Sequence, residues 1–259
     1  MKRVLILGAG LVSRPMVRYL LNLNDVELTV ATRTVSKALE LIGTHPRGRA
    51  VELLADDESN LHRLIASSDI VVSLLPYTYH PTVARHCIAL KKHLVTTSYV
   101  SEAMKALDNE ARRTGIILLN EIGLDPGIDH MSAMALIDRV KANGGRIISF
   151  ISSCGGLPAP EANDNPLGYK FSWSPRGVLM AGRNDARFLK DGREILIPAS
   201  QLFASSWRQK ITGVGELEAY PNRNSLPYIE LYGLEGIRTM IRATLRYPGW
   251  CETMQAISE

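Results

Sequence analysis

A glycine-rich turn near the start of the chain, Gly8-Ala9-Gly10, constrains the fold more than any other feature. Residues 2–7 before it form a short apolar run that is typical of a buried parallel strand. Residues 11–23 after it carry apolar side chains at helical spacing. A glycine turn between a strand and a helix predicts a dinucleotide-binding unit, in which the N-terminus of the helix holds the pyrophosphate.

The alternation of strand and helix patterns continues to residue 120. Strands are predicted at residues 27–32, 50–54, 70–75, 93–97 and 116–120, and helices at 35–42, 81–90 and 101–113. Strands that alternate with helices imply right-handed crossovers and one parallel sheet. We therefore expect an α/β, Rossmann-type domain with helices on both faces of the sheet over residues 1–124.

The pattern changes after Glu121. An amphipathic helix is predicted at 129–142 and a strand at 146–152, and a stretch rich in Gly, Pro, Asn and Ser follows. Several short strands and turns then extend to about residue 232. These features predict a second, α+β domain over residues 125–259 that binds substrate or forms a dimer.

Composition narrows the class of protein. The net charge of +4 comes from 30 basic and 26 acidic residues. This excess is too small to indicate nucleic acid, but it is compatible with an anionic cofactor or substrate. No apolar run approaches the roughly 18 residues that span a bilayer. The three cysteines lack the spacing of a disulfide framework or a zinc site. We expect a cytoplasmic protein without metal, nucleic acid or membrane as a partner.

The tip of the second predicted strand indicates which dinucleotide binds. NAD-binding proteins usually place an acidic residue there to bond the ribose hydroxyls. Here the tip is Thr32-Arg33-Thr34, and a guanidinium at Arg33 matches a 2′-phosphate. The sequence therefore favours NADP over NAD. Two alternatives stay open: the glycine turn binds no ligand, because Ser13 replaces the third glycine of the fingerprint, or Arg33 is a solvated loop arginine.

Asp125 and Tyr99 are the candidate catalytic residues. Each follows a predicted strand, so each lies at the carboxyl edge where such sheets bind ligands. Asp125 is the candidate general base, and the alternative is a turn-forming aspartate before Pro126. Tyr99 is a candidate to relay a proton or bond a substrate carboxylate, and the alternative is a packed tyrosine.

Several other polar residues are weaker candidates. Asp129 is expected to cap a helix, and His130 is favoured as a structural histidine although its type suits acid–base work. Arg223 suits carboxylate recognition unless it is a surface loop arginine. Cys154 has no basic neighbour or helix start that would activate it, so we expect it to be structural. The weakest carboxylate-binding candidates are Arg246 and Lys170.

Longer motifs resemble the saccharopine reductase family. They are GAGLVSRP at 8–15, SLLPY at 73–77, VTTSY at 95–99, NEIGLDPGIDH at 120–130, CGGLPAPE at 154–161, NPLGYKFSWS at 165–174, YPNRNS at 220–225 and TLRY at 244–247. The resemblance covers essentially the whole chain and is greatest to the NADP-dependent saccharopine dehydrogenases that form L-glutamate. Such enzymes oxidise saccharopine, a secondary amine, to aminoadipate semialdehyde and glutamate.

The resemblance implies a set of binding residues. The cofactor-binding candidates are Gly8, Ala9, Gly10, Leu11, Val12, Thr32, Arg33, Thr34, Leu75, Thr97, Ser98, Leu124, Asp125, Pro126 and Ser174. The substrate-binding candidates are Ser98, Tyr99, Asp125, Asn222, Arg223 and Asn224. The family also implies a homodimer formed through the second domain and a role in lysine biosynthesis or lysine degradation.

The chain departs from the family in three respects, one of which is Leu54 in place of an acidic residue after the third strand. The family tends to have Asp where Asn224 stands, and its members run well beyond 259 residues. The second domain is therefore expected to be truncated, and a second chain is a possible source of the remainder. Two other functions stay open: a non-catalytic or partner-dependent NADP-binding module, and a carboxylated-polyamine dehydrogenase of the carboxynorspermidine type.

Overall fold

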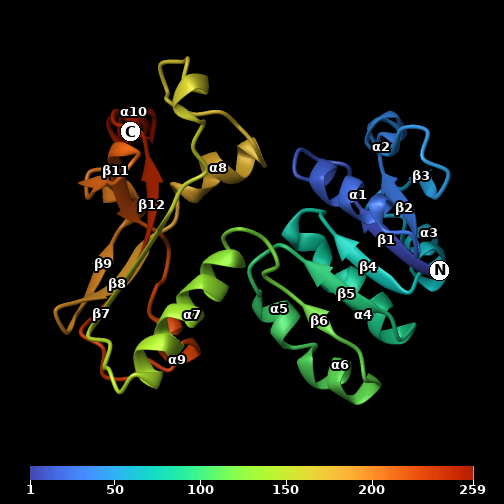
Figure 1. Cartoon of the computed structure of the whole chain (residues 1–259), viewed down its shortest axis with the longest axis horizontal. Helices are drawn as coiled ribbons and strands as arrows, with labels where there is room; N and C mark the ends of the chain where they lie inside the picture. Colours follow the sequence, from blue (N-terminus) through green and yellow to red (C-terminus); the bar gives the residue numbers. More distant parts are fainter. Residues whose placement is uncertain (259) are drawn as a thin grey trace. The chain divides into compact units, whose positions relative to one another are not determined.

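A six-stranded parallel sheet organises the first of two units, Met1–Ile128, in a computed structural model that describes residues 1–258 (Figure 1). Its strands are β1 (Lys2–Leu7), β2 (Val26–Thr32), β3 (Gly48–Glu52), β4 (Ile70–Ser73), β5 (His93–Thr96) and β6 (Leu118–Leu119). They pair in the order β3-β2-β1-β4-β5-β6. The order reverses between β1 and β4, and doubly wound folds bind ligands at the carboxyl ends of strands beside such a reversal.

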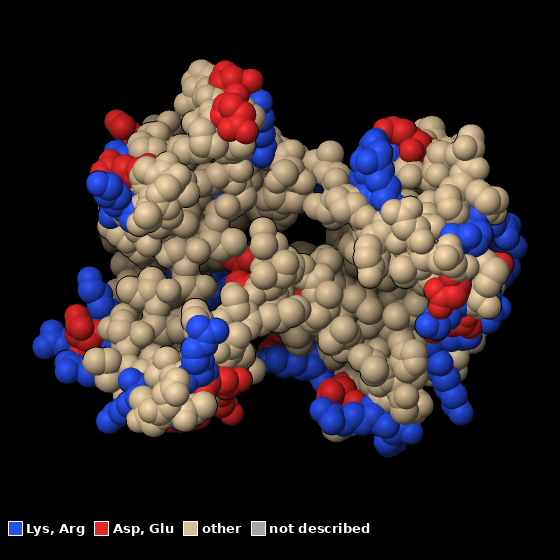
Figure 2. Space-filling view, in the orientation of Figure 1, with Lys and Arg blue, Asp and Glu red and all other residues tan. Residues whose placement is uncertain are grey.

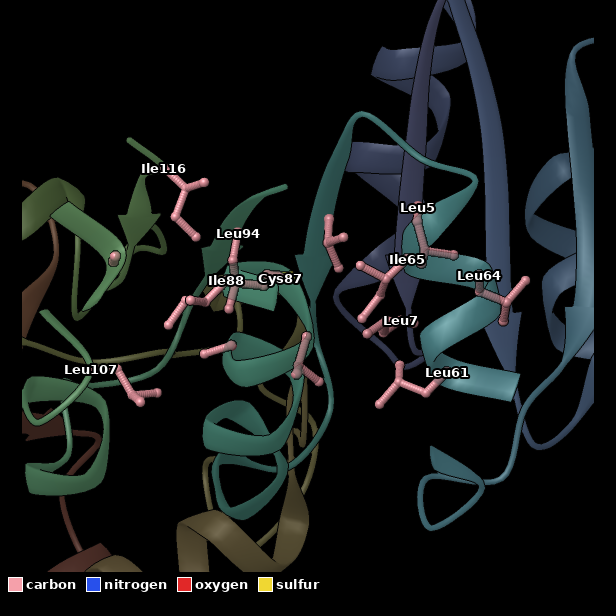
Figure 3. Close-up of a cluster of buried hydrophobic side chains, with 14 of the residues drawn as sticks. Leu5, Leu7, Leu61, Leu64, Ile65, Cys87, Ile88, Leu94, Leu107 and Ile116 are labelled. Atoms are coloured by element: carbon pink, nitrogen blue, oxygen red, sulfur yellow. The ribbon is translucent and has the colours of Figure 1, made fainter. Parts of the chain in front are cut away.

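Helices cover both faces of this sheet. They are α1 (Ser13–Asn22), α2 (Val35–Ile42), α3 (Glu58–Ala66), α4 (His80–Ala89), α5 (Glu102–Lys105) and α6 (Asp108–Thr114). Successive strand residues point to opposite faces, so Val4 and Ile6 pack with α1 and α2, whereas Leu5 and Leu7 pack with α3 to α6. Figure 3 shows the second of these cores, where Leu5 and Leu7 face α3. The predicted Rossmann-type fold is confirmed.

In this unit one helix was missed by the sequence analysis, and another was predicted wrongly. Helix α3 was not predicted, although Asp57 caps it by accepting a hydrogen bond from the Asn60 backbone N–H. The single helix predicted at 101–113 is two helices, α5 and α6. The Leu107 N–H bonds to the Met104 carbonyl, three residues back instead of four, and this tighter turn buries the Leu107 side chain in the core.

The second unit begins at Asp129 and contains a mostly antiparallel sheet. Its elements are α7 (Ile128–Ala142), β7 (Ser149–Cys154), α8 (Pro175–Ala181), β8 (Ala186–Lys190), β9 (Arg193–Ile197), β10 (Trp207–Ile211), β11 (Gly215–Pro221), α9 (Pro227–Leu231), β12 (Thr239–Arg246) and α10 (Trp250–Ser258). The strand order is β10-β11-β12-β8-β9, and β7 pairs with β12 in parallel. The division between the units follows Ile128, and the predicted domain boundary follows residue 124.

The central strand of the second sheet, β12, was not predicted, and the character of α7 was predicted wrongly. β12 contains two buried arginines, so it does not read as an apolar strand. α7 begins and ends close to its predicted bounds, but it is not amphipathic. It buries Ala133 and Ile137 and leaves Met131 and Leu136 exposed.

The surface carries charges of both signs. Figure 2 shows Lys and Arg side chains interspersed with Asp and Glu on the face drawn, in keeping with the small net charge. Cys87 and Cys251 are free, buried thiols, and burial raises their pKa values to about 12. None of the helices in residues 1–258 is long and apolar enough to cross a membrane.

Candidate functional site

The glycine turn has the backbone geometry of a phosphate-binding loop. Gly8 has φ +108°, and a Cβ atom there would lie 3.2 Å from the Leu74 carbonyl oxygen, so only glycine fits. A Cβ built on Gly10 meets no heavy atom within 4 Å, which leaves the backbone approachable. Ser13, in place of the third glycine, is buried, and its hydroxyl donates to the Gly8 carbonyl. The turn at the start of α1 therefore fits a pyrophosphate group.

The tip of β2 fits a 2′-phosphate. β2 ends at Thr32 and α2 begins at Val35, so Arg33 and Thr34 form the connection, and both are exposed. The tip residues Thr32, Arg33 and Thr34 include no acidic side chain, and Glu52 of β3 is the sheet partner of Thr32. A guanidinium with two neighbouring hydroxyls supplies the donors that distinguish NADP from NAD.

Tyr99 and Asp125 form a hydrogen-bonded pair at the carboxyl edge of the first sheet. Tyr99 follows β5 and Asp125 follows β6, and the Tyr99 hydroxyl donates to Asp125 Oδ1 at 2.6 Å. Both side chains are half-buried. A short hydrogen bond to a carboxylate fixes the direction of that carboxylate. The structure thus brings together the two predicted catalytic residues.

A tight loop positions Asp125. The Gly123 N–H donates to the Pro126 carbonyl at 2.9 Å, and the Ile128 N–H donates to the Gly123 carbonyl at 3.0 Å. A Cβ atom on Gly127, which has φ +150°, would lie 2.1 Å from the Gly123 carbonyl oxygen. Only glycine permits this approach, so the loop holds Asp125 in one place.

His80 is a site residue that the sequence did not reveal. It is the first residue of α4, and its side chain is buried. Nδ1 lies 3.1 Å from Ser73 Oγ, and Nε2 lies 2.9 Å from the hydroxyl of Ser98, a predicted cofactor and substrate contact. Burial lowers the pKa of His80 to about 4, so the imidazole is neutral at neutral pH. A histidine at the start of a helix does not by itself indicate, from the sequence, that it contacts Ser98 at the sheet edge.

One cofactor candidate, Ser174, and three substrate candidates belong to the second unit. Ser174 caps α8, where its hydroxyl accepts a hydrogen bond from the Gly177 N–H at 3.1 Å. Asn222, Arg223 and Asn224 follow β11 in an irregular segment, and the last two are exposed. The predicted site residues therefore form two sets, one within each unit.

Three weaker candidates have mainly structural contacts. The guanidinium carbon of Arg246 lies 4.9 and 5.1 Å from the centres of the Tyr169 and Trp250 rings. The charge of Arg246 therefore makes cation–π contacts within the second unit. Lys170 pairs with Asp164 on the surface. His130 stacks on the ring of Tyr228 in α9 and lies edge-on to the ring of Tyr232. Within residues 1–258, no group of three metal-ligating side chains has a geometry that holds a metal ion.

The strand order, the glycine turn and the polar carboxyl edge define a dinucleotide-binding α/β protein. Comparison with protein families identifies the family to which this dinucleotide-binding protein belongs. Residues 4–119 match the family described as "Saccharopine dehydrogenase NADP binding domain", and residues 123–259 match "Saccharopine dehydrogenase C-terminal domain". The chain belongs to the saccharopine dehydrogenase family, and the predicted family and the predicted cofactor, NADP, are confirmed.

Individual relatives agree with this assignment. The chain is 46% identical over 256 residues to "Saccharopine dehydrogenase [NADP(+), L-glutamate-forming]" of Pyricularia oryzae, and 46% identical over 257 residues to the Saccharomyces cerevisiae protein of that name. The match covers 99% of this chain and 57% of each relative. "Alpha-aminoadipic semialdehyde synthase, mitochondrial" of Bos taurus is 44% identical over 98% of this chain and 27% of its own length.

A solved structure shares the fold. The apo saccharopine dehydrogenase (L-Glu forming) from Saccharomyces cerevisiae superposes with a TM-score of 0.90 at 45% identity. The match covers 100% of this chain and 58% of that one. The chain thus spans a little over half the length of its fungal relatives.

Proposed function

We propose that the chain catalyses the NADP-dependent interconversion of saccharopine with aminoadipate semialdehyde and L-glutamate, by hydride transfer at a C–N bond. The hydrogen bond between Tyr99 and Asp125, at 2.6 Å, is the observation that carries the proposal. It places an oriented carboxylate at the sheet edge that also carries the glycine turn. The names of the fungal relatives, which are 46% identical, support the same reaction and the same cofactor.

The reaction requires a neutral substrate nitrogen before oxidation. We assign Asp125 to accept the proton of the secondary ammonium, with Tyr99 orienting the carboxylate through its hydroxyl. NADP, held by the glycine turn and the tip of β2, would supply the acceptor for the hydride of the neighbouring carbon. The resulting imine then adds water and collapses to the aldehyde and the amine of glutamate. Ser98, which is held by the buried imidazole of His80, is positioned to orient the substrate or the cofactor.

Three of the proposed substrate contacts, Asn222, Arg223 and Asn224, belong to the second unit. Saccharopine carries three carboxylates, and an arginine recognises a carboxylate through paired hydrogen bonds. Arg223 is exposed between two amide side chains, those of Asn222 and Asn224, so this segment presents both a charge and neutral donors. Ser174, which caps α8, is the proposed cofactor contact of this unit.

The setting of the enzyme is part of the proposal. We retain the prediction of a homodimer, in keeping with the family resemblance, and of a cytoplasmic location, in keeping with the free thiols of Cys87 and Cys251.

The test is to mix the purified chain with NADP and saccharopine and to follow the absorbance of the reduced nicotinamide. We expect saccharopine-dependent reduction with NADP. The Asp125→Asn variant should lose about 10²- to 10⁴-fold in turnover, the usual contribution of a general base, and should bind NADP as the unchanged chain does. Asn keeps the size of the side chain, so the loop should persist.

A matched control is Asp138→Asn, which makes the same change on an exposed position of α7. It should leave turnover unchanged. Tight NADP binding without turnover in the unchanged chain would contradict the proposal and indicate a binding module or a partner-dependent fragment. Full activity of Asp125→Asn would contradict the assigned base.

A further inference from the structure

The segment 222–224 is fixed by backbone hydrogen bonds on both sides. On one side, the Asn222 N–H donates to the Arg242 carbonyl at 2.8 Å, and the Arg242 N–H donates to Ser225 Oγ at 2.9 Å. On the other side, the Arg187 N–H donates to the Arg223 carbonyl at 2.8 Å, and the Ser225 N–H donates to the Arg187 carbonyl at 2.7 Å. The segment therefore lies between β8 and β12, and Arg242 of β12 contacts both of its ends.

The side chain of Arg242 is locked in turn. Its Nη2 lies 2.8 Å from Asp129 Oδ2, and its Nη1 donates to the Tyr228 hydroxyl at 2.8 Å. The Arg242 guanidinium carbon also lies 4.5 Å from the centre of the Tyr228 ring. The side chains of Arg242 and Asp129 are only 6% and 8% exposed. A buried charge pair with these hydrogen bonds allows little movement of either group.

These contacts join three elements around the segment. Asp129 lies in the first turn of α7, Arg242 in the middle of β12, and Tyr228 in α9, which begins two residues after Ser225. A change in the pair would therefore shift both the strand that bonds to the segment and the helix that follows it. Arg223, unlike Arg242, is exposed, and its backbone has φ +51°. The backbone of Arg242 bonds to the residues on either side of Arg223, Asn222 and Ser225.

We infer that Arg242 and Asp129 are positioning residues that hold residues 222–224 in the conformation that binds the carboxylates of the substrate. The inference rests on the proposed function. Arg223 contacts the substrate in this scheme, whereas Arg242 acts through the backbone of the segment, and Asp129 and Tyr228 act through Arg242. Binding of the substrate then depends on a charge pair that the substrate itself does not touch.

The variants Arg242→Lys and Asp129→Asn keep the size of each side chain and weaken the pair. Tyr228→Phe removes only the hydroxyl that accepts from Arg242. The control, Glu216→Gln, breaks the exposed ion pair between Glu216 and Arg208 in the same sheet. Each variant is examined by hydrogen exchange of peptides covering residues 221–226, by calorimetric titration with NADP and saccharopine, and by steady-state kinetics.

We expect exchange in 221–226 to become faster in Arg242→Lys and Asp129→Asn. Saccharopine affinity should fall by about tenfold or more and KM should rise, while kcat and NADP affinity change by less than about threefold. Tyr228→Phe should give a smaller change of the same kind, and Glu216→Gln should give none. A merely stabilising pair would not separate KM from kcat in this way.

Two results would overturn the inference. One is faster exchange with unchanged saccharopine affinity, which would make the pair purely structural. The other is unchanged exchange in both charge-pair variants, which would show that the pair does not hold the segment. Failure of the unchanged chain to bind saccharopine would instead overturn the proposed function, and with it the substrate role of the segment, and the control titration with NADP distinguishes that case from misfolding.

Discussion

The polar groups at the first sheet's carboxyl edge and those around β12 in the second unit are held in different ways. Tyr99 and Asp125 are half-buried, and their hydrogen bond lies at an edge where ligands approach. Arg242 and Asp129 are almost fully buried, and their contacts join helices to a strand. Half-buried groups are suited to exchange protons with a ligand, whereas buried charges are suited to hold a backbone in place.

The largest expected effect is the loss of the buried charge pair. Arg242→Ala leaves Asp129 buried without its charge partner, which typically costs about 3–5 kcal/mol of the free energy of unfolding. Urea unfolding followed by tryptophan fluorescence measures it, because Trp173, Trp207 and Trp250 all lie in the second unit. An exposed ion pair contributes about 0–1 kcal/mol. A loss this small would show that the buried pair does not hold the second unit together more strongly than a surface pair does.

An apolar core substitution in the first unit should cost nearly as much. Leu5 is 1% exposed between the sheet and α3, and Leu5→Ala should lower the free energy of unfolding by about 2–5 kcal/mol through lost burial and a cavity. Urea unfolding followed by circular dichroism measures the change. Leu39→Ala, on the exposed side of α2, is the control and should stay within about 0.5 kcal/mol of the unchanged chain.

The Arg33 prediction concerns cofactor choice. Arg33→Ala removes the guanidinium at the tip of β2 and should weaken NADP binding by about 1.5–3 kcal/mol, the range of hydrogen bonds to charged groups. NAD binding should stay the same, because NAD lacks the 2′-phosphate. Calorimetric titration with both nucleotides measures the difference, with Arg85→Ala on α4 as the control. An equal loss for NADP and NAD would refute the assignment.

The smallest expected effect is a pH dependence at His80. Its pKa is about 4 in the folded chain and about 6.5 when unfolded, so between these values the unfolded state binds more protons. Stability contributed by the neutral imidazole is present above pH 6.5 and is lost as the pH falls towards 4. From about pH 7.5 to pH 5 the loss should be about 2 kcal/mol.

Urea unfolding at the two pH values, in the unchanged chain and in His80→Gln, measures this term. The glutamine variant keeps polar atoms near Ser73 and Ser98 but does not titrate, so its decrease should be smaller by that amount. Equal decreases in both proteins would show that His80 is not the group responsible.

The two units also differ in how far the sequence predicts them. β1 and α1 follow local apolar periodicity and flank a glycine turn, so both were predicted, and the alternation of strands and helices predicted the parallel sheet. β12 was missed because an arginine in a sequence usually predicts an exposed position, and Arg242 and Arg246 are both buried. Only their partners in distant segments explain this burial. Local patterns do not contain such pairings.

The same limit applies to the site. Asp125 and Tyr99 were predicted because residues that follow parallel strands meet at one edge. His80 was not predicted, since its role depends on hydroxyls from two different strand ends that meet only in the folded chain. The holding of residues 222–224 by Arg242 likewise depends on bonds between segments that are distant in sequence.

The most direct test is to compare Asp125→Asn with Asp129→Asn in one steady-state assay with NADP and saccharopine. Each variant makes the same change, four positions apart, at a residue with a different assigned role. We predict that Asp125→Asn lowers kcat while saccharopine still binds, and that Asp129→Asn raises the KM for saccharopine while kcat is retained. If both variants changed the same parameter by similar factors, the division between a reacting edge and a positioning pair would be wrong.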